Sequence, residues 1–138
     1  MLKTPFCIGT LEVSNRIVMA PMHSGNCPDG LITDAIVDHY VSRSCDGATG
    51  LIITEFAYVS SQGRATPTQV SLADDTTLPG HSRLVEAVHA AGSKAFAQIV
   101  HAGGGTYPIS VRLGGGRGRN ASCRRLLRPR WGGMGYTA

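Results

Sequence analysis

Three short apolar runs, separated by stretches with helical spacing, most constrain what this chain can fold into. The runs are residues 16–21 (RIVMAP), 50–55 (GLIITE) and 94–100 (KAFAQIV). Each has about the length of a β-strand. Each is continuous rather than alternating, which is the pattern of strands buried on both faces of a parallel sheet. We therefore expect three parallel strands connected by helices.

The two segments between these runs carry helix start and stop signals. Thr33 can cap a helix over residues 34–45 (DAIVDHYVSRSC), in which apolar residues recur four positions apart. Pro79 suits the start, and Gly92 the end, of a second helix over residues 79–92 (PGHSRLVEAVHAAG). The order strand, helix, strand, helix, strand implies parallel strands with right-handed crossovers. It fits the beginning of either an eight-stranded (β/α)₈ barrel, which takes about 250 residues, or an open doubly wound sheet.

One connection between the predicted elements is long. Residues 56–78 are rich in polar and turn-forming residues, and they exceed the roughly 2 to 6 residues that usually join a strand to the next helix. Connections of this length are often functional.

The composition changes near residue 103. Residues 1–102 hold six Lys or Arg and nine acidic residues, a net charge of −3, whereas residues 103–138 hold seven Arg and no acid, a net charge of +7. Ten of the 18 glycines also fall in residues 103–138. The basic character of the whole chain therefore belongs to its last quarter. We expect residues 104–138 to form an irregular Gly/Arg-rich tail rather than a packed domain.

Two interpretations of this tail follow from its composition. Its arginines could neutralise phosphates while Trp131 or Tyr136 stacks on bases, which would make a nucleic-acid-binding module. Repeated aromatic residues are missing, however, and nothing upstream supports a polyanion partner. Alternatively, because Gly and Arg codons (GGN, CGN) are typical of a shifted frame in a GC-rich gene, residues 104–138 are an out-of-frame or truncated product. Another reading frame from about codon 104 would then encode the rest of the fold.

The cysteines and the hydropathy pattern limit the class of protein. The four cysteines, Cys7, Cys27, Cys45 and Cys123, form no CxxC pair and show no zinc-finger spacing, so we expect reduced thiols and no metal site. No secretory signal is present, and no apolar run approaches the ~20 residues needed to span a bilayer. These features favour a cytoplasmic protein without a membrane partner.

In parallel α/β proteins the functional site lies at the carboxyl ends of the strands. Two residues there have suitable side chains: Gln98, within the third run, and His101, just after it. A Gln amide both donates and accepts hydrogen bonds, so Gln98 can match the imide-like edge of a heterocycle or simply satisfy a strand end. His101 can equally contact a ligand or a loop carbonyl. The remaining strand-end residues are Pro21, Met22, His23, Glu55 and Phe56.

Several of these motifs, taken in order, resemble one enzyme family. They are NRIVMAPM at 15–22, DHYVSRS at 38–44, GLIITE at 50–55, VSSQGRA at 59–65 and AVHAAGSKAFAQIVHAG at 87–103. In sequence and spacing they are similar to the N-terminal third of the Old Yellow Enzyme family, the NADH:flavin oxidoreductases, over about residues 2–103. The resemblance implies a TIM (β/α)₈ barrel that binds FMN at the carboxyl ends of its strands. It also implies hydride transfer from NADH or NADPH to a small-molecule acceptor, such as an activated alkene.

The same resemblance suggests roles for particular residues. Gln98 corresponds to the family glutamine that hydrogen-bonds the pyrimidine edge of the isoalloxazine. His23 replaces the Thr or Cys of many relatives, and it either donates a hydrogen bond near flavin N5 or O4 or points to solvent. Phe56 stands where relatives have a small residue under the flavin edge, so either its ring is turned aside or Ala57 takes that place. His101 is a candidate substrate-binding residue. The segment expected against the flavin is Ala20, Pro21, Met22 and His23.

No catalytic residue is assigned. In the family, the His/His or His/Asn pair that binds the substrate carbonyl, and the usual tyrosine proton donor, lie beyond the third strand. We therefore expect residues 1–103 to be the N-terminal portion of an FMN-binding barrel. Alone, it should bind FMN weakly or not at all and be inactive. The sequence does not indicate the acceptor, the choice between NADH and NADPH, or the oligomeric state.

Overall fold

A computed structural model describes residues 1–103, and its centre is a three-stranded parallel sheet. The strands β3 (Val18–Met19), β4 (Leu51–Ile53) and β7 (Lys94–Phe96) lie in the order β3-β4-β7. Leu51 pairs with Val18 on one side and with Lys94 on the other. The predicted parallel arrangement is therefore confirmed, with shorter strands than the apolar runs. The prediction for residues 104–138 lies outside the described residues.

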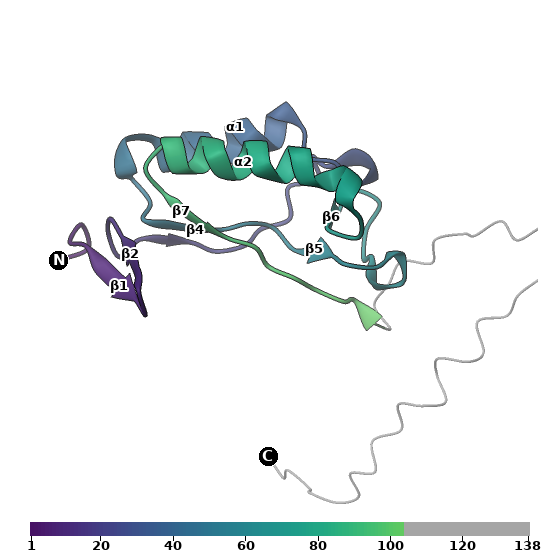
Figure 1. Ribbon diagram of the computed structural model, residues 1–138, viewed down its shortest axis with the longest axis horizontal. Helices are drawn as coiled ribbons and strands as arrows, with labels where there is room; N and C mark the ends of the chain where they lie inside the picture. Colours follow the sequence, from purple (N-terminus) through teal and green to yellow (C-terminus); the bar gives the residue numbers. More distant parts are fainter. Residues whose placement is uncertain (104–138) are drawn as a thin grey trace, which may run out of the picture. The chain divides into compact units, whose positions relative to one another are not determined.

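Two helices cover one face of this sheet (Figure 1). Helix α1 spans Asp34–Ser44, and the Thr33 hydroxyl oxygen accepts the Ile36 N–H at 3.4 Å, as the predicted cap requires. Helix α2 spans Leu78–Ala90 and has a proline in its first turn. Short 3₁₀ helices are η1 (Pro28–Gly30), η2 (Cys45–Gly47), η3 (Ser61–Gly63) and η4 (Asp75–Thr77). No helix within residues 1–103 combines the length and apolar character needed to cross a membrane.

The core lies between the helices and this face of the sheet. Its buried members are Cys27, Ile36, Tyr40, Ile52, Ala57, Val70, Leu84 and Val88. On the opposite face, Val18 and Phe96 are 49% and 41% exposed. The expectation that the strands are buried on both faces is therefore wrong for residues 1–103, because both described α-helices pack on the same side.

An extra residue interrupts the pairing of the strand that follows β4. The Thr54 N–H donates to the Phe96 carbonyl, and the Ala57 N–H donates to the Gln98 carbonyl, each at 2.8 Å. Thr54 and Ala57 are three positions apart, whereas their partners Phe96 and Gln98 are two positions apart. One strand therefore has an extra residue, which is the pattern of a β-bulge. As a consequence Ile52 and Ala57, an odd number of positions apart, both contribute to the core beneath the helices.

The long connection of residues 56–78 contains a small sheet of its own. Strands β5 (Ala57–Tyr58) and β6 (Val70–Ser71) pair in parallel, and all four of their residues are buried. The interpretation of this segment as a polar connection is therefore incomplete, because it also contains two buried strands. Their pairing satisfies part of the buried backbone.

An N-terminal hairpin precedes the sheet and was not predicted. It consists of β1 (Phe6–Ile8) and β2 (Leu11–Val13), joined through Gly9, whose φ of +60° favours glycine. The buried Asn15 then connects the chain to the start of β4. Its amide donates to the Gly47 carbonyl at 2.7 Å, and its side-chain oxygen accepts the N–H groups of Ile17 and Gly50, each at 2.9 Å.

Candidate functional site at the carboxyl ends of the strands

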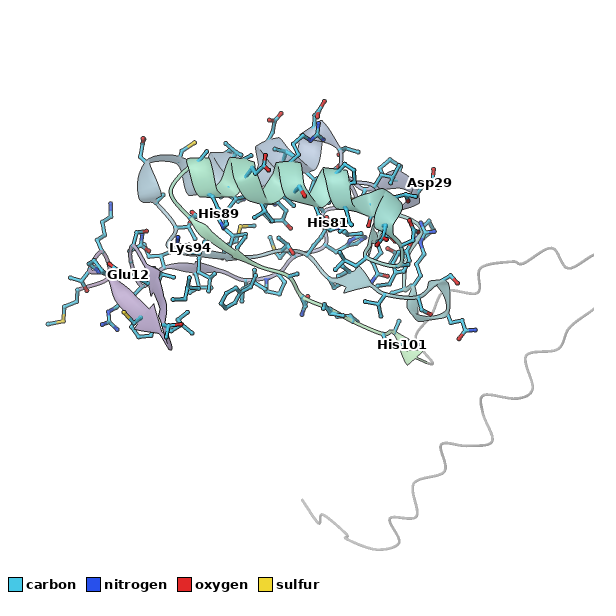
Figure 2. All side chains as sticks on the ribbon, viewed as in Figure 1. Glu12, Asp29, His81, His89, Lys94 and His101 are labelled. Carbon is cyan, nitrogen blue, oxygen red and sulfur yellow. The ribbon has the colours of Figure 1, made fainter. Side chains whose placement is uncertain are left out.

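The predicted site residues lie on segments that leave the same end of the sheet. In Figure 1 the three parallel strands run away from the β1–β2 hairpin and toward β5 and β6. Figure 2 shows His101 at this end, far along the chain trace from Lys94, which begins β7. Because parallel strands place their carboxyl ends at one edge, the segments after β3, β4 and β7 are brought together there.

Glu55, which follows β4, is the most highly connected side chain at this end. Its side chain is fully buried, and its two carboxylate oxygens face four hydrogen-bonding groups. One oxygen lies 2.7 Å from the Ser24 main-chain N and 3.0 Å from His23 Nδ1. The other lies 3.0 Å from the Ser24 hydroxyl and 3.4 Å from the Cys27 sulfur. Glu55 therefore holds His23, Ser24 and Cys27 in the segment that follows β3.

His23 connects this carboxylate to the long connection. Its second ring nitrogen, Nε2, lies 3.2 Å from the Thr66 hydroxyl and 3.3 Å from the Thr68 hydroxyl. The Phe56 ring packs edge-on against the imidazole, with centroids 5.1 Å apart. The His23 side chain is 29% exposed, so it is held on several sides and still reaches solvent.

Two buried groups support Glu55 from the helix side. The Tyr40 hydroxyl oxygen, from α1, accepts the Glu55 main-chain N–H at 2.7 Å. Burial raises the pKa of Tyr40 to about 12, so the phenol stays protonated. Burial, together with the nearby charge of Glu55, also raises the pKa of the Cys27 thiol to about 12. Both groups are therefore neutral hydrogen-bonding supports rather than reactive groups.

Gln98 and His101 are held mainly through the backbone. The Gln98 carbonyl accepts the Ala57 N–H, and its half-buried side-chain amide has no hydrogen-bond partner within residues 1–103. The His101 ring packs against Gly63, where an added Cβ would lie 2.7 Å from the imidazole. His101 Nδ1 accepts the Gly103 N–H at 3.1 Å, which leaves Nε2 to carry the proton of the neutral ring. Both side chains therefore keep polar atoms available for a ligand.

The remaining candidates differ in accessibility. Met22 is 62% exposed, Ala20 is also exposed, and Pro21 is half-buried. The Ala57 side chain instead lies in the core on the helix side of the sheet. Its main-chain N–H and carbonyl are both occupied, by Gln98 and Val100. The Phe56 ring packs against the His23 imidazole, and the choice between a turned-aside Phe56 and Ala57 under the flavin edge stays a prediction.

Sequence reasoning missed the central position of Glu55 and the contribution of Thr66 and Thr68. A glutamate is rarely fully buried unless it is paired, and the partners of the Glu55 carboxylate lie 28 to 32 positions away in the sequence, so no local signal indicated its burial. No local pattern indicates the two threonines, because they lie more than 40 positions from His23. Within residues 1–103, no group of three or more His, Cys, Asp or Glu side chains is arranged to hold a metal ion.

Comparison with known families matches this chain over most of its length. The model of the NADH:flavin oxidoreductase / NADH oxidase family matches residues 1–111. The chain belongs to this family. The assignment made from the sequence motifs is therefore confirmed, and the family consists of flavin-dependent enzymes that use NADH or NADPH.

Curated members of the NADH:flavin oxidoreductase family show clear sequence similarity. A metal reductase of Desulforamulus reducens is 42% identical over 103 residues, covering 75% of this chain and 15% of the relative. An NADH oxidase of Thermoanaerobacter brockii is 44% identical, covering 73% of this chain and 16% of the relative. An NADPH dehydrogenase of Bacillus subtilis is 40% identical over 104 residues, covering 74% and 30%. The chain thus spans less than a third of the length of these relatives.

Solved structures of the family share the fold. Morphinone reductase, solved in complex with tetrahydroNAD, has a TM-score of 0.71 at 31% identity, and the match covers 77% of this chain and 28% of that chain. Old Yellow Enzyme from Pichia sp. AKU4542 has the same TM-score at 25% identity, covering 76% and 27%.

Proposed function

We propose that residues 1–103 form the first βαβαβ part of a TIM barrel in an NAD(P)H-dependent flavin oxidoreductase and supply one wall of its FMN site. The observation that carries this proposal is the family match over residues 1–111, combined with three parallel strands in the order β3-β4-β7. In this order the ends of β3 and β7 flank the end of β4. The exposed face of the sheet then faces the barrel interior, where further strands would cover Val18 and Phe96.

The residues at the strand ends fit a flavin. The Gln98 amide is half-buried and has no partner within residues 1–103, so it can both donate to and accept from the polar edge of the isoalloxazine. Met22, largely exposed, offers an apolar surface to the ring system, next to Ala20 and Pro21. His23 follows Met22 directly and is the polar residue of this proposed flavin-facing segment. The buried Ala57 contributes its backbone to the bulge rather than its side chain to the cofactor.

When bound, FMN supplies the hydride chemistry, accepting hydride from NADH or NADPH and passing it to an activated alkene or a similar small-molecule acceptor. This chain's own residues position the cofactor and shield it. His101, with Nε2 free to donate, is the candidate contact to the substrate. No catalytic proton donor is assigned among residues 1–103. The nucleic-acid alternative depends on arginines within residues 103–138, and the structure describes only residues 1–103, so the structure does not bear on that alternative.

A chimera tests this proposal in the context of a complete barrel. Residues 1–103 would replace the matching segment of the NADPH dehydrogenase of Bacillus subtilis, which is 40% identical over 104 residues. We expect the purified chimera to carry FMN and to oxidise NADPH. A chimera that has the circular dichroism spectrum of the parent enzyme but neither binds FMN nor oxidises NADPH would contradict the proposal.

Gln98→Ala in this chimera tests the predicted flavin contact. Losing one or two hydrogen bonds at about 1 kcal/mol each should raise the Kd for FMN roughly five- to thirtyfold. Gln62→Ala is the matched control, because Gln62 is an exposed glutamine in η3, and we expect its Kd to equal that of the unsubstituted chimera. Equal Kd values for the two variants in a fluorescence-quenching titration would remove Gln98 from the site.

The 138-residue chain provides a separate test. With one face of its sheet exposed in residues 1–103, we expect it to quench FMN fluorescence weakly or not at all and to show no NADPH oxidation. Purification of the chain as a stoichiometric yellow protein would refute this expectation.

A further inference from the structure

The fully buried carboxylate of Glu55 meets groups that act as donors. The Ser24 main-chain N–H can only donate, and it shares its carboxylate oxygen with His23 Nδ1. The Ser24 hydroxyl accepts the Asn26 N–H at 3.1 Å, so its own proton is available for the other oxygen. The Cys27 thiol donates to that oxygen as well. This set matches an ionised carboxylate, which accepts only.

This arrangement determines which ring nitrogen of His23 carries the proton. A carboxylate oxygen that faces Nδ1 at 3.0 Å requires hydrogen on Nδ1. In the neutral ring Nε2 is then an acceptor, and both groups within its reach, the Thr66 and Thr68 hydroxyls, can donate to it. This tautomer satisfies the contact between Nδ1 and Glu55, and the two hydroxyls share the single lone pair of Nε2. The opposite tautomer would place two lone pairs, on Nδ1 and on the carboxylate, against each other.

We propose that Glu55 is a positioning residue that holds the neutral His23 as its Nδ1–H tautomer, so that the lone pair of Nε2 faces Thr66 and Thr68. The significance of this pair for oxidoreduction rests on the flavin site proposed above; the tautomer itself does not. A carboxylate paired with one imidazole nitrogen orients the ring and fixes which nitrogen carries the proton.

The same pair joins three segments of the chain. Glu55 follows β4, His23 follows β3, and Thr66 and Thr68 belong to the long connection between β5 and β6. The connection is also drawn inward by Arg64, whose guanidinium contacts the carbonyls of its own turn and lies 5.4 Å from the centre of the Tyr58 ring. His23 is therefore set at the junction of all three segments rather than left as a free side chain.

Nitrogen-15 NMR of the full 138-residue chain labelled in histidine measures the tautomer directly. The pH is raised until each ring is neutral, and His23→Asn identifies the His23 signals. We expect His23 as Nδ1–H. His81 and His101 are internal references of the opposite tautomer, because His81 Nε2 bonds the Ser71 carbonyl at 2.8 Å and His101 Nδ1 accepts the Gly103 N–H. A neutral His23 found as Nε2–H would overturn the proposal.

Two substitutions of Glu55 separate positioning from general support. Glu55→Leu removes the acceptor, and we expect the His23 signals to shift to those of the Nε2–H tautomer while His81 is unchanged. Glu55→Gln keeps an acceptor oxygen of similar reach and should retain Nδ1–H. Retention of Nδ1–H in a folded Glu55→Leu chain, or its loss in Glu55→Gln, contradicts the assignment. If Glu55→Leu unfolds by circular dichroism, the wild-type and Glu55→Gln spectra decide the question. Because no flavin is needed, these outcomes are independent of whether the chimera binds FMN.

Discussion

Replacement of Tyr40 by Phe would test the hydrogen bond that joins helix α1 to the end of β4. The Tyr40 hydroxyl oxygen accepts the Glu55 N–H at 2.7 Å, and both residues are only 1% exposed. Phenylalanine keeps the ring and its packing but removes this acceptor. The Glu55 N–H lies at the bulge, where the strand ladder supplies no alternative carbonyl.

The size of the effect follows from this burial. Leaving a buried N–H without a partner costs about 1 to 3 kcal/mol, and the complete burial of Tyr40 places the expected loss near ~2 kcal/mol. For a domain of about 100 residues, each kcal/mol lowers Tm by about 4 to 8 °C, so a decrease of about 8 to 16 °C is expected.

Urea and thermal unfolding followed by circular dichroism would measure this loss, with the urea m-value unchanged. Tyr58→Phe is the matched control, because the Tyr58 hydroxyl forms no hydrogen bond with another described residue, and its free energy of unfolding should change by less than about 0.5 kcal/mol. If the two variants were equally stable, the reasoning about the Glu55 N–H would be refuted.

Two further predictions concern Asn15 and Cys27. Asn15→Ala should lower the free energy of unfolding by about 2 to 4 kcal/mol, more than Tyr40→Phe, because it removes the partners of the Gly47 carbonyl and of the Ile17 N–H and leaves the Gly50 N–H with the Ile17 carbonyl alone; a loss below that of Tyr40→Phe in urea unfolding would contradict this. Cys27 should react with a thiol reagent near neutral pH only after urea unfolding, because it is buried and its pKa is raised to about 12. Loss of one slow-reacting thiol in Cys27→Ser would identify it, and equally fast reaction of every thiol in the folded chain would show the reasoning to be wrong.

The elements that depend on local signals were predicted well. Helix α1 follows directly from the Thr33 cap and its apolar spacing, and helix α2 from Pro79 in its first turn. The parallel order of the three strands follows from the alternation of strand and helix. These signals are contained within a few residues of the elements that they define.

The features that the sequence did not reveal depend on contacts between distant segments. The bulge after Thr54 is seen only in how residues 54–57 pair with residues 96–98, and nothing in residues 54–56 alone indicates it. The core position of Ala57 follows from that bulge. The one-sided cover of the sheet could not be predicted either, because an apolar run looks the same whether its second face meets helices or further strands.

The junction beneath His23 has a mechanical consequence. Tyr40 belongs to α1, and its hydroxyl oxygen accepts the Glu55 N–H. The Glu55 carboxylate in turn hydrogen-bonds His23 and Ser24. A displacement of helix α1 along the sheet would therefore reach the imidazole through only two hydrogen bonds, one from the Glu55 N–H to Tyr40 and one between the Glu55 carboxylate and His23. Helix α1 is thus connected to the carboxyl ends of the strands, where the candidate ligand site lies. A substitution on the buried side of α1 would therefore alter the position of His23 without contacting it.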